Sequence, residues 1–227
     1  MPQTPSAPAP GTKRAPARAP LPEIGPGFDA AEIMQLDAAK LIQMLKDPSA
    51  TVFQKAKACQ RLAVIGGKDA VPALASLLSH PELSNYARFG LEPNPDPSAD
   101  AAFRAALPQL NGRLLAGVIT SIGVRRDAKS VGALEKFLSH SDDDVAGAAA
   151  GALARIGGPA IAKVLQQAAA SARAPLQPVM ARACLICTDA LITSNRAQAM
   201  ELYRFLSEPA RPKAVRLAAF RALAGTA

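Results

Sequence analysis

Two cysteines three residues apart, Cys184 and Cys187, are the residues whose spacing most invites a chemical role. A C-x-x-C pair can be a redox dithiol, half of a zinc site or a haem attachment point. Haem attachment needs a histidine directly after the second cysteine, where this chain has Thr188, and zinc needs two further ligands. Cys187 also falls where an internal repeat elsewhere has alanine, so we expect both thiols to be small buried packing groups.

The histidines and one acidic run are the other candidates for chemistry. His80 and His140 fall at the same polar turn of two helical hairpins, and we expect solvent or a helix end to satisfy them. The run Asp142–Asp144 precedes a helix expected to start near Val145, which favours helix capping over a cation site. The sequence therefore predicts no catalytic residue, no metal ligand and no cofactor, and a protein that is not an enzyme.

A repeated block positions these residues on helices. It consists of a small residue, a large aliphatic residue four positions on and a helix end after about three more, which places the apolar residues on one helix face. Its aliphatic position recurs at Leu62, Leu91, Ile119, Leu153, Leu191 and Leu223. Glycines such as Gly66, Gly123 and Gly157 are expected to end the helices in the left-handed conformation, with Asn195 taking that role in one copy.

Each block pairs with a second amphipathic segment to form a helical hairpin. The predicted hairpins are 37–66, 69–94, 97–123, 128–157, 159–194 and 196–224. No hairpin can bury its apolar face alone, so neighbours must stack. With 4% aromatic residues and no tryptophan, the core must be built from small and aliphatic side chains. We expect an all-α fold, a right-handed α-solenoid of about six hairpins covering residues 37–227.

The N-terminal segment 1–27 has a different composition from the rest of the chain. It contains eight of the twenty prolines and few bulky apolar side chains, so it is expected to be a disordered basic tail. The net charge of +8 divides into +3 in residues 1–22, +4 in residues 195–227 and +1 between them. The body of the protein is therefore nearly neutral.

No targeting segment is visible in the sequence. The first twenty residues lack an apolar stretch, and no later run is long enough for a membrane span. Three cysteines do not suggest a disulfide framework. We therefore expect reduced thiols, no membrane partner and a cytoplasmic location.

The repeat resembles the short HEAT-like repeats of the phycobilisome-lyase type. The resemblance covers about 37–224 and rests on Leu62/Ile65/Gly66-type helix ends, on Asp69-Ala70 and Asp127-Ala128, and on the segments 83–93 and 121–128, which are similar to planctomycete and verrucomicrobial HEAT-repeat proteins. It implies that the second helix of each pair lines a concave surface. The candidate partner-binding residues are Arg88 on such a helix, Tyr86 near it, and Arg125 and Arg126 in the next loop between repeats.

The repeat, the lack of a catalytic constellation and the near-neutral body together predict a non-catalytic protein-binding scaffold that uses the concave surface. The alternative is nucleic-acid binding through the basic tail and the C-terminal hairpin, which carries Arg196, Arg204, Arg211, Lys213, Arg216 and Arg221. The third hypothesis is a bilin lyase, and HEAT-like iron hydroxylases are disfavoured because no glutamate follows either histidine. The helix over 211–224 has an apolar face (Val215, Ala218, Ala219 and Leu223) with no following hairpin, which predicts self-association through this end.

Overall fold

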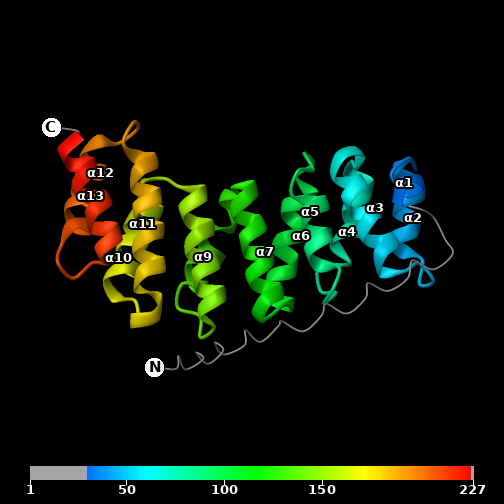
Figure 1. Ribbon diagram of the computed structural model, residues 1–227, viewed down its shortest axis with the longest axis horizontal. Helices are drawn as coiled ribbons and strands as arrows, with labels where there is room; N and C mark the ends of the chain where they lie inside the picture. Colours follow the sequence, from blue (N-terminus) through cyan, green and yellow to red (C-terminus); the bar gives the residue numbers. More distant parts are fainter. Residues whose placement is uncertain (1–29, 226–227) are drawn as a thin grey trace, which may run out of the picture.

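A computed structural model describes residues 30–225, which form one elongated stack of helices (Figure 1). Thirteen α-helices and four 3-10 turns make up this described part, and it contains no strand. The expected all-α solenoid is therefore confirmed. The predicted disordered tail, residues 1–27, lies outside the described residues.

All six predicted hairpins are present. They are α2 (Ala38–Lys46) with α3 (Val52–Ile65), α4 (Val71–Ala75) with α5 (Ser84–Leu91), α6 (Ser98–Ala106) with α7 (Gly112–Arg125), α8 (Val131–Phe137) with α9 (Asp143–Ile156), α10 (Pro159–Ser171) with α11 (Gln177–Leu191), and α12 (Arg196–Ser207) with α13 (Lys213–Gly225). The 3-10 turns η1 (Lys68–Ala70), η2 (Leu107–Gln109), η3 (Ala128–Ser130) and η4 (Ala174–Leu176) join helices. The second helices α3, α5, α7, α9, α11 and α13 pack in that order as one layer.

A short helix that the sequence did not predict precedes the first hairpin. It is α1 (Ala30–Ile33), and it packs against α3. Its Ile33 is fully buried, so the described stack begins before the predicted boundary at residue 37.

Polar side chains start several helices by accepting backbone N–H groups. Thr51 and Gln54 form a reciprocal capping box at the start of α3. Asp142 caps α9, since its carboxylate accepts the N–H of Asp144 at 2.9 Å, and the helix begins at Asp143, two residues before the predicted start. The capping role expected for the acidic run is confirmed for Asp142.

The two histidines are satisfied at equivalent turns. Nδ1 of His80 accepts the backbone N–H groups of Glu82 and Leu83, each at 3.2 Å. Nδ1 of His140 accepts the N–H of Asp142 at 3.1 Å. Both imidazoles therefore hold the turn between the two helices of a hairpin.

The predicted left-handed helix ends are wrong at three of the four positions. Gly66 has φ −74°, and Asn195 begins α12 as its N-cap instead of ending α11. Gly123 lies inside α7, which ends at the left-handed Arg126, with φ 53°. Of these four residues, Gly157 alone has a positive φ, of 74°, and it is the C-cap of α9. The spacing of the glycines is that of a helix end, but Gly123 lies inside a helix because the packing against a neighbouring helix leaves no room for a side chain.

Gly123 lets α7 approach α9 closely. A Cβ atom added there would lie 2.6 Å from the Cα of Ala152, a separation that real Cβ atoms do not reach. The helices meet backbone to backbone at this point, and the α7–α9 pair makes the most extensive contact between helices of the described stack.

The apolar face predicted to be open on α13 is turned inward. Val215 and Ala219 are buried, and Leu223 packs against the core formed with α11 and α12. The large apolar side chains that α13 does expose are Leu217 and Phe220, at 49% and 54%. Helix 211–224 therefore buries the stripe that the sequence assigned to its exposed side.

Replacing Gly123 with alanine should separate α7 from α9. We expect Gly123→Ala to lower the free energy of unfolding by about 1–3 kcal/mol, because the new methyl group overpacks the contact. The control is Gly132→Ala in α8, where a Cβ meets nothing within 4 Å. The control should be neutral or stabilising by up to about 1 kcal/mol. Urea denaturation measures both, and equal effects would contradict the close-contact interpretation.

Candidate functional site

The C-x-x-C pair is buried in α11. Cys184 and Cys187 are both fully inaccessible, and burial raises the pKa of Cys184 to about 12. Burial likewise raises the pKa of Cys187, whose sulfur lies 3.9 Å from the carbonyl oxygen of Gly158. The third thiol, Cys59, is buried too, and its pKa is about 12 for the same reason. A thiol with so high a pKa is a poor nucleophile and metal ligand at neutral pH, as expected for packing groups.

Arg88 connects α5 to α7. Its guanidinium donates to the carbonyl oxygen of Gly117 and the hydroxyl of Ser121, both at 3.2 Å, and to the side chain of Asn85 at 2.7 Å. Burial lowers the pKa of Arg88, and the carboxylate of Glu92, 3.9 Å away, opposes that shift. A Cβ at Gly117 would lie 2.9 Å from the Arg88 side chain, so this glycine makes room for the guanidinium.

Arg125, the last residue of α7, contacts α6 and the segment at the C-terminal end of α5. It forms an ion pair with Asp100 and donates to the carbonyl oxygens of Leu91, Glu92 and Asn94 at 3.1, 2.8 and 2.6 Å. These carbonyls lie at the end of α5 or just after it, where the helix no longer supplies N–H partners for them. Arg125 therefore stabilises the joint between the second and third hairpins.

The other two residues of the predicted set lie in different surroundings. Arg126 is exposed, next to Arg125 in sequence. Tyr86 is half-buried and packs against the core. The structure thus places Tyr86 and Arg88 on α5, and Arg125 and Arg126 at the end of α7, without bringing the four side chains into one cluster.

A second joint surrounds Asp127, which opens η3 as the family resemblance implied. Its carboxylate forms an ion pair with Arg104 and accepts hydrogen bonds from the hydroxyl of Ser130 at 2.6 Å and the N–H of Lys129 at 3.2 Å. Burial alone would raise the pKa of Asp127, but the bonds from Ser130 and Arg104 hold it below the ordinary value of 3.8. Asp69, at the corresponding place in the earlier hairpin, is exposed and does not cap η1.

A groove runs across the outer side of the second-helix layer, and the sequence reading missed it. We call it the central groove, and its volume is about 470 Å³. Its lining includes Thr120 of α7, Gly147, Ala148, Gly151 and Arg155 of α9, and Val179, Arg182 and Ile186 of α11. Small residues at helical spacing on α9 were the signal that could have revealed it.

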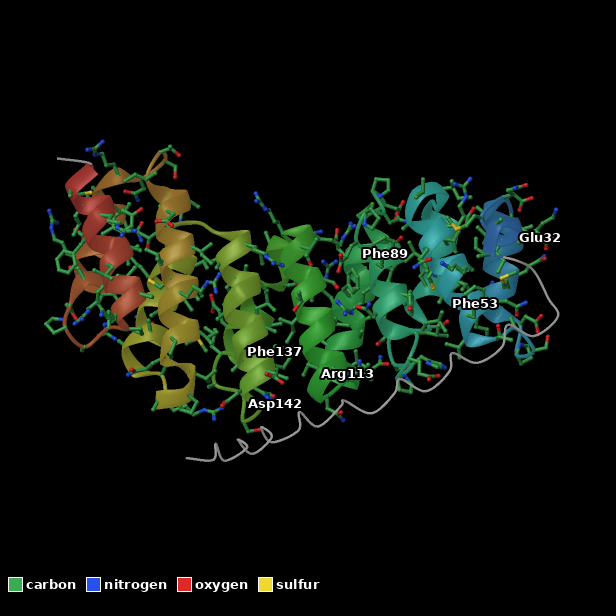
Figure 2. The ribbon with its side chains drawn as sticks, in the orientation of Figure 1. Glu32, Phe53, Phe89, Arg113, Phe137 and Asp142 are labelled. Atoms are coloured by element: carbon green, nitrogen blue, oxygen red, sulfur yellow. The ribbon has the colours of Figure 1, made fainter. Side chains whose placement is uncertain are left out.

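A neighbouring depression extends the central groove toward α5. It shares Thr120 and Ala148 with the central groove and is also lined by Arg88, Arg113 and Asp144. Figure 2 shows Arg113 near the end of α7 that lies beside Asp142, while Phe89 lies toward the other end of the stack's second helices. Together the two hollows carry four arginines and one aspartate, so this surface is basic although the body is nearly neutral.

The remaining candidates are a metal site, a membrane-spanning helix and the arginines of the C-terminal hairpin. Among residues 30–225, no three His, Cys, Asp or Glu side chains are grouped so that they could hold a metal ion. Within the same range, no helix is long and apolar enough to cross a membrane. In the C-terminal hairpin, Arg211 lies over the ring of Phe205 and donates to the carbonyl of Ala169, and Arg216 donates to that of Pro209.

Truncating Arg125 should destabilise the stack far more than truncating its neighbour. Arg125→Ala removes the ion-pair partner of Asp100 and the donor to the carbonyl oxygens of Glu92 and Asn94, and we expect a loss of about 3 kcal/mol in the free energy of unfolding. Arg126→Ala removes an exposed side chain and should change it by less than about 0.5 kcal/mol. Chemical denaturation of the two variants gives the comparison, and similar losses would show that Arg125 does not secure this joint.

Asp127 should contribute stability only while it is ionised. Because its pKa is lowered on folding, its contribution is complete above the unfolded value near 3.8 and is lost as the pH falls through the lower folded value. Asp127→Asn should therefore cost about 2 kcal/mol at pH 7, and the difference from the wild type should shrink below pH 4. The exposed Asp69→Asn is the control. A difference that is constant with pH would contradict this role.

Comparison with known proteins shows which repeats part of this chain resembles. Residues 101–185, from α6 into α11, match the family model for HEAT repeats. The chain is similar to the crystal structure of an engineered protein, with 23% identity over 83% of this chain and 96% of that one and a TM-score of 0.49. It is also similar to the complex of CpcE and CpcF of phycocyanin lyase from Nostoc sp. PCC7120, with 18% identity over 96% and 100% of the chains and a TM-score of 0.45. No curated protein sequence matches it. The expected HEAT-like repeat is therefore supported for residues 101–185.

Proposed function

We propose that this chain is a protein-binding scaffold that holds its partner on the outer face of the second helices. The central groove is the observation that carries the proposal. It spans three successive hairpins, from Thr120 on α7 to Ile186 on α11, and combines apolar and charged side chains. Grooves with this mixture suit a bound segment, because apolar contacts supply affinity and polar groups fix orientation.

Exposed apolar side chains elsewhere on the same layer support an extended contact. Val64 on α3, Phe89 on α5 and Val124 on α7 are 75%, 55% and 46% exposed, and they line a shallow hollow together. Ile186 and Val179 on α11 are also exposed. Exposed apolar groups gathered on one face are typical of interaction surfaces.

We infer that the scaffold acts without catalysis. The groups in it with the greatest nucleophilic potential are the thiols, and the pKa of about 12 for Cys59 and Cys184 leaves almost no thiolate at neutral pH. The charged groups lining the central groove are two arginines. Arginine orients carboxylates or phosphates but cannot give up its proton in a protein, so it serves recognition better than acid–base chemistry.

The predicted partner-binding residues take different parts in this proposal. Arg88 would contribute through the depression that continues the central groove, where part of its guanidinium already contacts α7. Arg126, being exposed, would contact a partner that reaches the end of α7, and Tyr86 would do so at the side of α5. Arg125 would act indirectly, by stabilising the contact between the second and third hairpins.

Nucleic-acid binding through the tail and the C-terminal hairpin is the alternative function. Arg211 and Arg216 donate to carbonyl oxygens of their own chain, so these N–H groups are not available to phosphates, although the positive charges remain. Self-association through α13 stays a prediction, and the apolar side chains it would use are Leu217 and Phe220. Both functions would use surfaces other than the central groove.

Site-specific photo-crosslinking tests the proposed surface. A benzoylphenylalanine is placed at Thr120 in the central groove, and in a control at Gln167 on the exposed side of α10. In an extract of the source organism, we expect one protein to be crosslinked from position 120 and not from position 167. Crosslinks of equal yield from both positions, or crosslinks to nucleic acid alone, would overturn the proposal.

A further inference from the structure

The central groove has the dimensions of a short peptide segment. Along α9 its lining runs from Gly147 to Arg155, which is about 12 Å at the rise of an α-helix. That length accommodates about four residues of extended chain. Gly151 lies midway, and a Cβ added to it would meet nothing within 4 Å, so the floor of the groove is open to a ligand.

The side chains around this floor differ in chemistry. Val179 and Ile186 present exposed apolar surface on α11, at 40% and 44%. Arg182 lies between them in sequence on the same helix, and Arg155 lies at the other end of the lining, on α9; both are exposed. The lining therefore offers apolar surface with two positive charges beside it, and it contains no acidic side chain.

The two groove arginines are unpaired, unlike those that hold the stack. Arg88, Arg104, Arg125, Arg173 and Arg211 each form an ion pair with a carboxylate of this chain. Within residues 30–225, the guanidinium groups of Arg155 and Arg182 have neither an ion pair nor a hydrogen bond. Each guanidinium can donate two parallel hydrogen bonds to a carboxylate, so two unpaired arginines beside an apolar surface are complementary to carboxylates close to an apolar side chain.

We propose that the central groove binds a short acidic segment of a partner protein, with a bulky apolar side chain against Val179 and Ile186 and carboxylates on Arg155 and Arg182. This inference rests on the proposed scaffold function and adds the chemistry of the bound segment. A nucleic acid fits less well, because no aromatic side chain lines the groove to stack on bases.

Selection from a displayed library of random octapeptides, with the full chain as bait, tests the chemistry directly. We expect enriched peptides to carry at least two acidic residues around an apolar one. Reversing both charges, Arg155→Glu with Arg182→Glu, should turn the enrichment toward basic peptides. The same reversal at the exposed lysines of the first-helix layer, Lys136→Glu with Lys163→Glu, should leave the preference acidic.

Affinity measurements with one enriched acidic peptide distinguish the contribution of the arginine charges to binding from that of the shape of the groove. Arg155→Ala and Arg182→Ala should each weaken binding about tenfold, and binding should fall as salt increases. Gly151→Leu should abolish binding by filling the groove, while Gly132→Leu, at an equally open glycine of α8, should not. Thermal midpoints close to that of the wild type show that each variant is folded.

The outcomes distinguish this inference from the function on which it rests. A partner crosslinked at position 120 together with peptides that show no acidic preference would overturn the acidic segment and keep the scaffold. An acidic preference that persists in the Arg155→Glu, Arg182→Glu variant would place the binding elsewhere and overturn it as well. If neither the crosslink nor the peptide selection gives a result, the scaffold function itself is wrong. If single-stranded DNA displaces the peptide at equal affinity, the ligand is a phosphate group and the acidic segment is overturned.

Discussion

The whole structure depends on the fact that one helical hairpin cannot bury its own apolar face. Neighbouring hairpins must supply the missing contact, and the second-helix layer shows how closely they do so at Gly123 and Ala152. Close approach requires small residues on both helices, which is consistent with a core rich in alanine. The same preference for small side chains on α9 hollows its outer side and leaves the central groove.

Polar joints then fix the position of each hairpin relative to the next. The side chain of Asn94 donates to the carbonyl oxygens of Gly66 and Gly67 in the first hairpin, and its own carbonyl accepts from Arg125 in the third. At the opposite end of the second helices, Arg113 reaches the turn at Pro81, and Arg173 reaches the turn at Ser141. These contacts consist mostly of hydrogen bonds to carbonyls near helix ends and turns, groups that would otherwise need water or another partner.

The arginines differ in whether such an acceptor lies within their reach. Those that reach a helix end or a carboxylate in a neighbouring hairpin are held in place and serve the stack, as Arg125 does. Arg155 and Arg182 lie one and two helices farther along, where the groove floor offers them no acceptor. Positive charge in a nearly neutral body is thus left on the surface that also exposes apolar side chains, which is why we assign recognition to it.

The sequence by itself determined the hairpins, their order, the capping role of Asp142 and the burial of the cysteines. All of these follow from local periodicity and from interactions within a few residues, which a single sequence displays. It did not determine which arginines are free, because the acceptors of Arg88 and Arg125 in neighbouring hairpins are 25 to 34 residues away. It misread Gly123 and the outer face of α13 for the same reason: helical spacing shows that residues share a face, but only the packing of the next helix decides whether that face is covered. The central groove is likewise a property of three hairpins at once, so it appeared only when their helices were placed side by side.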